Sequence, residues 1–163
     1  MLTADILRER LYYDPETGLF TWVSKKSPKS RVKVGTTAGT IESYGYRIIK
    51  LYGKIYKAHR LAWLYMTGEW PAELIDHING NRSDNRWGNL REATPAQNVM
   101  NMKPVGASGA KGVCWHKKDK KWQAAIRHRG TTLYLGQFNS RDEAARVYAV
   151  AARDLFGEFA RTV

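Results

Sequence analysis

An acid and a histidine stand side by side at Asp76-His77, at the start of a stretch rich in Asn, Asp, Gly and Arg. Asn89 follows Asp76 by thirteen residues, and Asn98 comes nine residues later. On a strand, the Asp76 and His77 side chains would point to opposite faces. A carboxylate oxygen with an amide oxygen suits Mg²⁺, and a neutral imidazole suits removal of a proton from water. The residue types therefore permit a metal site with a base beside it.

The spacing also fits a second interpretation, in which residues 75–98 form only a solvated loop. Asp-His pairs are common, and stretches rich in Asn, Asp and Gly usually connect other elements on the protein surface. Spacing alone favours this loop, so the chemical interpretation needs support from the identities of the surrounding residues.

Residues 10–102 resemble the HNH homing endonucleases of bacteriophages and group I introns. The resemblance rests on Asp76-His77 through Asn89 to Asn98, on residues 56–63 upstream, and on the turn at residues 14–18. It implies a ββα-metal core, in which two strands and a helix surround one divalent ion. His77 would be the general base, Asp76 and Asn98 the metal ligands, and Asn89 the residue that holds the loop and orients His77.

The third letter of the HNH name is an Asn here, Asn98, and an amide binds metal more weakly than imidazole or carboxylate. We expect Mg²⁺, with Mn²⁺ as the alternative. His59 and Arg60 could support the site: His59 could approach the phosphate, although a His at the start of an amphipathic helix more often packs or caps. Arg60, like the other arginines of this region, could clamp phosphate or be a solvated charge; these others are Arg82, Arg86 and Arg91.

The elements that must position these residues follow from periodicity and turn signals. Before residue 102 the pattern predicts a β-hairpin turning at Gly53-Lys54, a helix that ends at Gly68, and a helix that begins at Thr94-Pro95. It also predicts a helix over 3–11 and a strand over 19–23. After a Pro- and Gly-containing linker, three alternating strands over 112–116, 122–128 and 132–138 precede a helix that begins with the Ser140 to Glu143 capping box. The fold class is α+β: a ββα-metal nuclease core with an N-terminal β-rich region (1–102), a linker (103–109), and a small three-stranded antiparallel sheet packed on one helix (110–163).

Residues 108–160 resemble the plant ethylene-response-factor (APETALA-type) DNA-binding domain, through residues 122–127, 135–138 and 143–148. The resemblance implies that the sheet lies in the DNA major groove with the helix behind it. Alternation turns Trp122, Ala124 and Ile126 toward the helix, together with Leu133 and Leu135. The expected DNA face then comprises Lys111, Cys114, His116, Arg127, Thr132 and Tyr134, with loop lysines Lys117, Lys118, Lys120 and Lys121. Cys114, Ala125 and Thr132 replace the Arg, Glu and Arg typical of the plant domain, so its target sequence does not transfer.

The overall charge points to a polyanionic partner. The 163 residues carry 27 Lys and Arg against 15 Asp and Glu, a net charge of +12. Residues 1–102 contribute 15 − 10 = +5, and residues 103–163 contribute 12 − 5 = +7. Cys114 is the only cysteine, which excludes an internal disulfide and a Cys-rich zinc site. No apolar stretch suits a membrane span or a signal peptide, so we expect a cytoplasmic protein with no membrane partner. The resemblance to homing endonucleases implies a bacterial or phage-infected host cell.

These patterns together predict a metal-dependent endonuclease that nicks or site-selectively cleaves double-stranded DNA, as a monomer or weak homodimer, in a bacteriophage or mobile element. One alternative is a non-catalytic DNA-binding transcriptional regulator whose nuclease core has decayed; the filled core positions argue against it. Another is an RNA-binding protein, which the implied major-groove sheet disfavours, because that groove is too narrow in A-form RNA.

Overall fold

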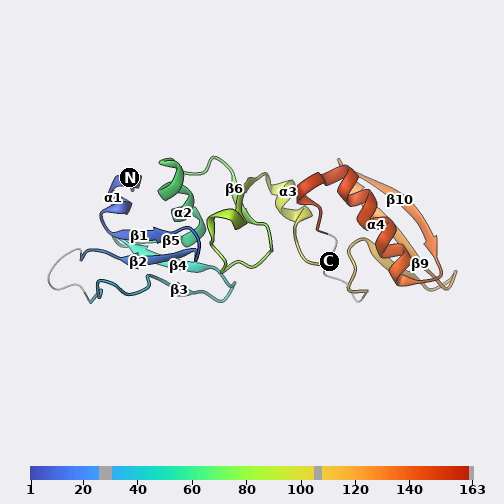
Figure 1. The fold of residues 1–163 in the computed structure, drawn as a ribbon. Coiled ribbons are helices and arrows are strands. Elements are labelled where there is room, and N and C mark those ends of the chain that lie inside the picture. Colours follow the sequence, from blue (N-terminus) through green and yellow to red (C-terminus); the bar gives the residue numbers. More distant parts are fainter. Residues whose placement is uncertain (26–30, 105–107, 162–163) are drawn as a thin grey trace. The chain divides into compact units, whose positions relative to one another are not determined.

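The computed structural model describes residues 1–25, 31–104 and 108–161 (Figure 1). It forms two compact units, Met1–Thr94 and Pro95–Val163, which we call the N-terminal and C-terminal units. The expected linker, 103–109, falls inside the C-terminal unit, and its residues 105–107 lie outside the described residues. The helix that carries Asn98 therefore groups with the C-terminal unit, whereas the sequence assigned it to the nuclease core.

The N-terminal unit begins with a short helix and a hairpin. α1 (Ala4–Arg8) starts after Thr3, whose hydroxyl accepts a hydrogen bond from the Ile6 N–H. β1 (Leu11–Asp14) follows directly and pairs antiparallel with β2 (Leu19–Trp22). The sequence placed residues 3–11 in one helix, but the helix ends earlier because Leu11 and Tyr13 are buried on one face of β1, with exposed Tyr12 between them.

A three-stranded antiparallel sheet and a helix complete the core of this unit. The strand order is β3 (Thr40–Ile41), β4 (Arg47–Leu51), β5 (Lys54–Lys57), and α2 (Ala58–Thr67) continues directly from β5. The hairpin and helix lie where the sequence predicts them, and α2 ends at Gly68 with a positive φ of 86°. Their buried side chains form one cluster with the first hairpin, including Leu7, Leu11, Phe20, Ile49, Leu61 and Leu64.

The motif segment forms a second two-stranded antiparallel pair. β6 (Leu74–His77) pairs with β7 (Leu90–Ala93), and Asp76 lies opposite Arg91. Between the strands runs a loop that ends in the 3₁₀ turn η1 (Trp87–Asn89). The loop and both strands belong to the N-terminal unit, so Asp76, His77 and Asn89 are positioned by one body.

The C-terminal unit begins with α3 (Pro95–Met100) and contains a sheet of order β10-β9-β8. Its strands are β8 (Val113–His116), β9 (Lys121–His128) and β10 (Thr131–Phe138). α4 (Arg141–Phe156), capped by the Ser140 hydroxyl, packs on this sheet and is followed by η2 (Gly157–Phe159). The small core between them contains Val113, Ala124, Ile126, Ala144, Tyr148 and Ala152.

A bulge in β10 changes one detail of the expected alternation. The pairing with β9 shifts between Tyr134 and Gly136, which leaves Leu135 without a register partner. Leu133 pairs with the core residue Ile126 and so shares its face, as expected, but it is 40% exposed and lies outside the buried core. Phe138, beyond the bulge, packs against the core instead. Among the described residues, no helix is long and apolar enough to cross a membrane.

Gly112 is a position where the backbone approaches its neighbours too closely for a side chain. It has a φ of +65°, and an added Cβ would overlap the Tyr148 ring and the Ala125 carbonyl oxygen. Gly130 has a φ of +81° with nothing near its would-be Cβ. Gly112→Ala should therefore lower the free energy of unfolding of the C-terminal unit by about 1–3 kcal/mol more than Gly130→Ala does. Hydrogen–deuterium exchange of the β9 amides measures this difference, and equal effects of the two changes would contradict the close packing.

Candidate active site

Asp76 and His77 lie at the end of β6 and are both buried, with 5% and 4% of their surfaces exposed. Asp76 faces Arg91 across the strand pair, and its Oδ2 accepts a hydrogen bond from Arg91 Nε at 3.0 Å. Arg91 Nη2 lies 3.0 Å from the same oxygen. A buried carboxylate needs such a charged partner, because desolvation otherwise penalises its ionised form. Arg91 thus gives the buried Asp76 carboxylate a charged hydrogen-bond partner.

Asn85 determines which nitrogen of His77 carries the proton. The Asn85 amide nitrogen donates to the Ser83 carbonyl at 3.3 Å, so its oxygen faces His77 Nε2, at 3.1 Å. An amide oxygen only accepts, so His77 Nε2 must donate and a neutral ring holds its lone pair on Nδ1. Burial lowers the pKa of His77 below its ordinary 6.5, against the opposing effect of the Asn85 hydrogen bond. The imidazole is therefore neutral near pH 7, the form that a general base needs.

His59 packs against His77 rather than extending toward solvent. The two rings meet edge to face with their centroids 4.9 Å apart, and Tyr46 lies 5.2 Å from His59 and 6.1 Å from His77. Burial, followed by the neighbouring His77, lowers the pKa of His59 to about 3. His59 is thus a neutral packing group in the structure, which corresponds to the packing alternative of the sequence analysis.

The arginines considered as phosphate clamps differ in their surroundings. Arg60 donates to the backbone oxygens of Glu73 and Pro71, at 3.3 and 3.5 Å, and so ties α2 to the segment before β6. Arg86 is engaged by Asp84, with Nη2 2.7 Å from Oδ2. Both arginines therefore have a partner within the protein.

Two exposed cations flank the ring of Tyr46 beside His77. Lys57 Nζ lies 4.0 Å from the ring centroid, and the Arg82 guanidinium carbon lies 5.0 Å from it. Arg82 also donates to the Tyr44 carbonyl at 3.1 Å. Lys57 and Tyr46 could not be recognised from the sequence, because nothing in their spacing links them to His77. Lys57 and Arg82 place positive charge beside the buried histidine.

Asn89 closes the loop between β6 and β7. Its side-chain oxygen accepts from the Asn79 N–H at 2.9 Å, and its amide nitrogen donates to the Asp84 carbonyl at 2.7 Å. It is buried, with 8% of its surface exposed. These are hydrogen bonds of the type expected for the central Asn, whereas its effect on catalysis stays a prediction. Asn85 was not recognised, because the sequence does not distinguish it from the other asparagines nearby.

The expected metal ligands come from different units. Asp76 belongs to the N-terminal unit, and Asn98, half-buried on α3, belongs to the C-terminal unit. Among the described residues, no group of three or more His, Cys, Asp and Glu side chains could hold a metal. The expected pair is instead one carboxylate and one amide. These hard oxygen donors fit Mg²⁺, which commonly uses one or two protein ligands and keeps several waters.

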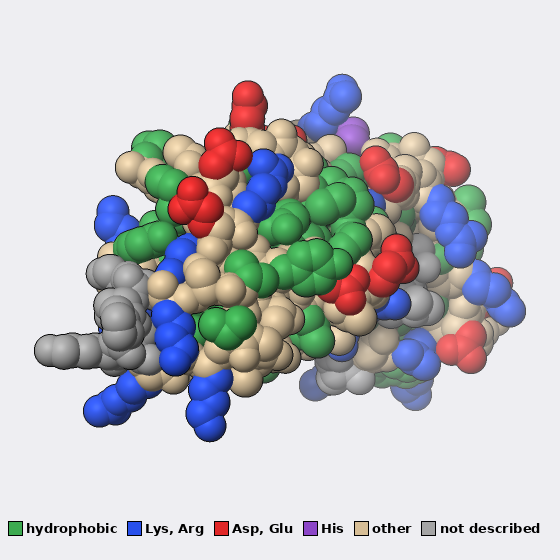
Figure 2. Space-filling view, turned by 60° about the vertical axis from the view of Figure 1, so that its left-hand side comes forward, with side chains coloured by type: hydrophobic (Ala, Val, Ile, Leu, Met, Phe, Trp, Pro, Cys, Tyr) green, Lys and Arg blue, Asp and Glu red, His purple; other side chains and the backbone are tan. Residues whose placement is uncertain are grey.

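The open face of the C-terminal sheet carries most of the residues expected to contact DNA. Arg127, Thr132 and Tyr134 are exposed, and Thr132 pairs with Arg127 across β9 and β10. His116 Nδ1 lies 3.1 Å from Asp119 Oδ2. The exposed side chains in the adjoining turn include Lys117 and Lys118. On the face of the molecule shown in Figure 2, Lys and Arg side chains are spread out with Asp and Glu among them, without one continuous basic patch.

Lys111 does not join this face, which corrects the sequence-based assignment. Its ammonium donates to the carbonyls of Val99 and Met100, at 3.1 and 2.5 Å, at the C-terminal end of α3. Burial lowers the pKa of Lys111, yet a cation here also interacts favourably with unpaired helix carbonyls. The charge therefore contacts α3 within the C-terminal unit, and a contact of Lys111 with DNA is not part of the function proposed below.

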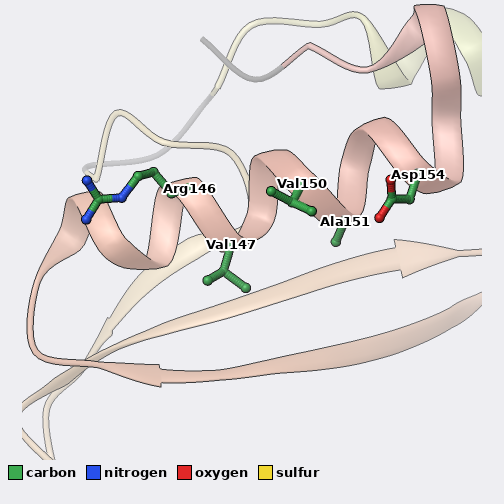
Figure 3. Close-up of a pocket in the computed structure, with 5 residues that line it drawn as sticks. All are labelled: Arg146, Val147, Val150, Ala151 and Asp154. Carbon is green, nitrogen blue, oxygen red and sulfur yellow. The ribbon is translucent and has the colours of Figure 1, made fainter.

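A shallow hollow of about 370 Å³ runs along α4, away from the residues described above (Figure 3). Five residues line it at helical spacing: Arg146, Val147, Val150, Ala151 and Asp154. None is among the predicted site residues, and Val150 is 57% exposed. We assign this hollow no role in catalysis.

Comparison with known proteins gives a consistent family. The sequence profile of the HNH endonuclease family matches residues 56–100, which include Asp76, His77, Asn89 and Asn98. Protein 3.8 of Escherichia phage T7 is 36% identical over 121 residues, which cover 69% of this chain and 97% of the phage protein. The uncharacterised HNH endonuclease L560 of Acanthamoeba polyphaga mimivirus is 34% identical over 118 residues, or 71% of this chain.

The chain spans 61% of the length of the mimivirus relative. A solved structure, described as DNA binding and cleavage by the HNH homing endonuclease I-HmuI, is 28% identical with a TM-score of 0.43. That alignment covers 56% of this chain and 51% of the other. The identity to the phage T7 protein over nearly its whole length, together with the matched motif, establishes the family: the chain belongs to the HNH endonucleases.

Proposed function

We propose that this HNH family member is a metal-dependent endonuclease that hydrolyses phosphodiester bonds in double-stranded DNA. The observation that carries the proposal is the state of His77: it is buried, neutral near pH 7, and hydrogen-bonded through Nε2 to Asn85. This leaves Nδ1 as the nitrogen that can accept a proton. The adjacent Asp76 carboxylate, the +12 net charge and the family membership support the same activity.

In the proposed mechanism, His77 Nδ1 takes a proton from the attacking water. Asn85 holds the ring in the required tautomer, and Asn89 holds the loop that carries Asn85. Asp76 and Asn98 would hold one Mg²⁺ or Mn²⁺ ion, which, when bound, stabilises the charge on the leaving 3′ oxygen. Lys57 and Arg82 attract the DNA backbone toward His77, because both cations lie against Tyr46 at the edge of the site.

The C-terminal unit would bind the duplex through the open face of β8, β9 and β10. Its net +7 and the exposed Arg127, Thr132 and Tyr134 support this role, as does the resemblance to the APETALA-type domain. One site of this kind cuts one strand, so a monomer would nick and a double-strand break would need two copies or two events. The relatives from phage T7 and a mimivirus support a viral or mobile-element context.

His77→Ala should abolish nicking of supercoiled plasmid in Mg²⁺ or Mn²⁺, with rates at least about 10²–10⁴-fold lower than those of the unchanged protein. DNA affinity should stay nearly constant, because a proton-transfer group contributes to rate and little to binding. Plasmid nicking and a gel-shift titration measure the two quantities side by side.

The control is the unchanged protein with and without a chelator, which should stop cleavage by removing the metal. Cleavage by His77→Ala at the normal rate would disprove the base assignment. Tight DNA binding with no cleavage by the unchanged protein would instead favour a non-catalytic regulator.

Arg127→Ala and Lys111→Met should differ in their effect on the salt dependence of DNA binding, although the sequence placed both side chains on one DNA-binding surface. Arg127 is exposed on the open sheet face, so its loss should reduce the slope of log K against log [salt] by about 1. Lys111→Met should leave that slope unchanged, because its ammonium contacts α3 carbonyls. Filter binding to a duplex at several salt concentrations tests both, and the opposite result would overturn the assigned face.

A further inference from the structure

The turn at residues 14–18, which the proposed mechanism does not use, contacts the loop that holds His77. We infer that this turn is a positioning element for the general base: it fixes the backbone at Asn85, and Asn85 in turn fixes the tautomer and orientation of His77. The inference rests on the proposed function, because His77 is treated as the base. The β1–β2 hairpin, whose Tyr13 lies 72 positions before Asn85, would then affect catalysis.

The first contact is a buried hydrogen bond at the base of the turn. The Tyr13 hydroxyl donates to the Asn85 carbonyl at 2.6 Å, and both residues are only 1% exposed. Burial raises the pKa of Tyr13, so the hydroxyl keeps its proton and remains a donor. Because the Asn85 side chain accepts from His77 at 3.1 Å, Asn85 is bonded to Tyr13 through its backbone and to His77 through its side chain.

The second contact is a close approach of two backbones. Gly18 has a φ of +71°, and an added Cβ would overlap the backbone nitrogen of Arg86 and the carbonyl carbon of Asn85. The Trp87 N–H donates to the Pro15 carbonyl at 2.9 Å. Three consecutive loop residues therefore touch the turn through their backbones, so a shift of the turn must shift Asn85.

The turn is itself stiff enough to act as a support. The Asp14 carboxylate accepts from the Glu16 N–H at 2.9 Å and from the Thr17 hydroxyl at 2.8 Å. The Gly18 N–H donates to the Asp14 carbonyl at 2.8 Å, which closes the turn. The hairpin on either side is anchored by Tyr13 and Phe20, which belong to the hydrophobic core.

The loop has other anchors, at Asn89 and at the hydrogen bond from Arg82 to the Tyr44 carbonyl, but these lie at different points of the loop. Asn89 holds the Asp84 carbonyl and the Asn79 N–H, so its side chain supports the loop one residue before Asn85. A displacement of about 1 Å in a catalytic group can cost about 10²-fold in rate. The turn thus supplies the contact that keeps the Asn85 oxygen against His77 Nε2.

Gly18→Ala tests the inference, with Gly53→Ala as the matched control. Both positions have positive φ values, +71° and +83°, but nothing lies within 4 Å of the would-be Cβ at Gly53. Gly18→Ala should lower kcat for plasmid nicking by about 10–10²-fold, with KM for DNA changed by less than about 2-fold. Gly53→Ala should leave both values within about 2-fold of the unchanged protein.

Tyr13→Phe is the gentler variant, because it removes only the hydroxyl; Tyr12→Phe, at the exposed neighbouring position, is its control. The ¹⁵N chemical shifts of the His77 ring report the tautomer without any need for activity. We expect the Nε2–H form in the unchanged protein and in the two controls, and a mixture of tautomers in Gly18→Ala and Tyr13→Phe.

The two readouts separate failure of the inference from failure of the proposed function. If the unchanged protein does not nick DNA, the proposed function fails, while the ¹⁵N shifts still test whether the turn controls His77. If Gly18→Ala and Tyr13→Phe retain both the normal kcat and the Nε2–H tautomer, the inference is overturned. It is also overturned if kcat falls while the His77 tautomer stays as in the unchanged protein.

Discussion

The hydrogen bond between His77 Nε2 and the Asn85 side-chain oxygen is the interaction on which the candidate site depends. A buried imidazole can place its proton on either nitrogen, and only one arrangement leaves Nδ1 able to accept a proton. Asn85 selects that arrangement at 3.1 Å, and its own amide is fixed by the Ser83 carbonyl. The loop carries this amide, and the first hairpin contacts the loop at the Asn85 carbonyl.

Two different influences act on the ionisable side chains around this hydrogen bond: burial and pairing with an opposite charge. Burial keeps His77 and His59 neutral, whereas the Asp76 carboxylate is hydrogen-bonded to the Arg91 guanidinium. Adjacent residues on one short strand thus contact different kinds of partner. The neutral imidazole and the paired carboxylate that the proposed hydrolysis would use thus result from the packing of this strand.

Much of the fold follows from local patterns, whereas the decisive site contacts do not. The Gly68 helix end and the alternation of β9 are local signals, and both are found where the sequence predicts them. The β10 bulge is not encoded by alternation, because period-two counting has no place for the extra residue, Leu135, that the register skips. Charge likewise predicted a DNA contact for Lys111, since composition cannot show whether an ammonium meets a phosphate or a helix carbonyl. Asn85 becomes recognisable only through Tyr13, which lies 72 positions earlier in the chain.

The attachment of α3 to Lys111 limits how the chain can be recombined. Genes of modular enzymes can exchange parts where the parts share few contacts, and a Pro- and Gly-containing stretch such as 103–109 is a natural place to look for such a junction. A chimera joined there would separate α3 from the ammonium that caps it and would pair Asn98 with an unrelated partner module. A junction at Thr94–Pro95 keeps the helix with its cap, but it divides the matched HNH segment and places Asn98 on a different module from Asp76. Neither position is therefore a neutral place to exchange parts, because α3 is capped by Lys111 on one side and carries the proposed partner of Asp76 on the other.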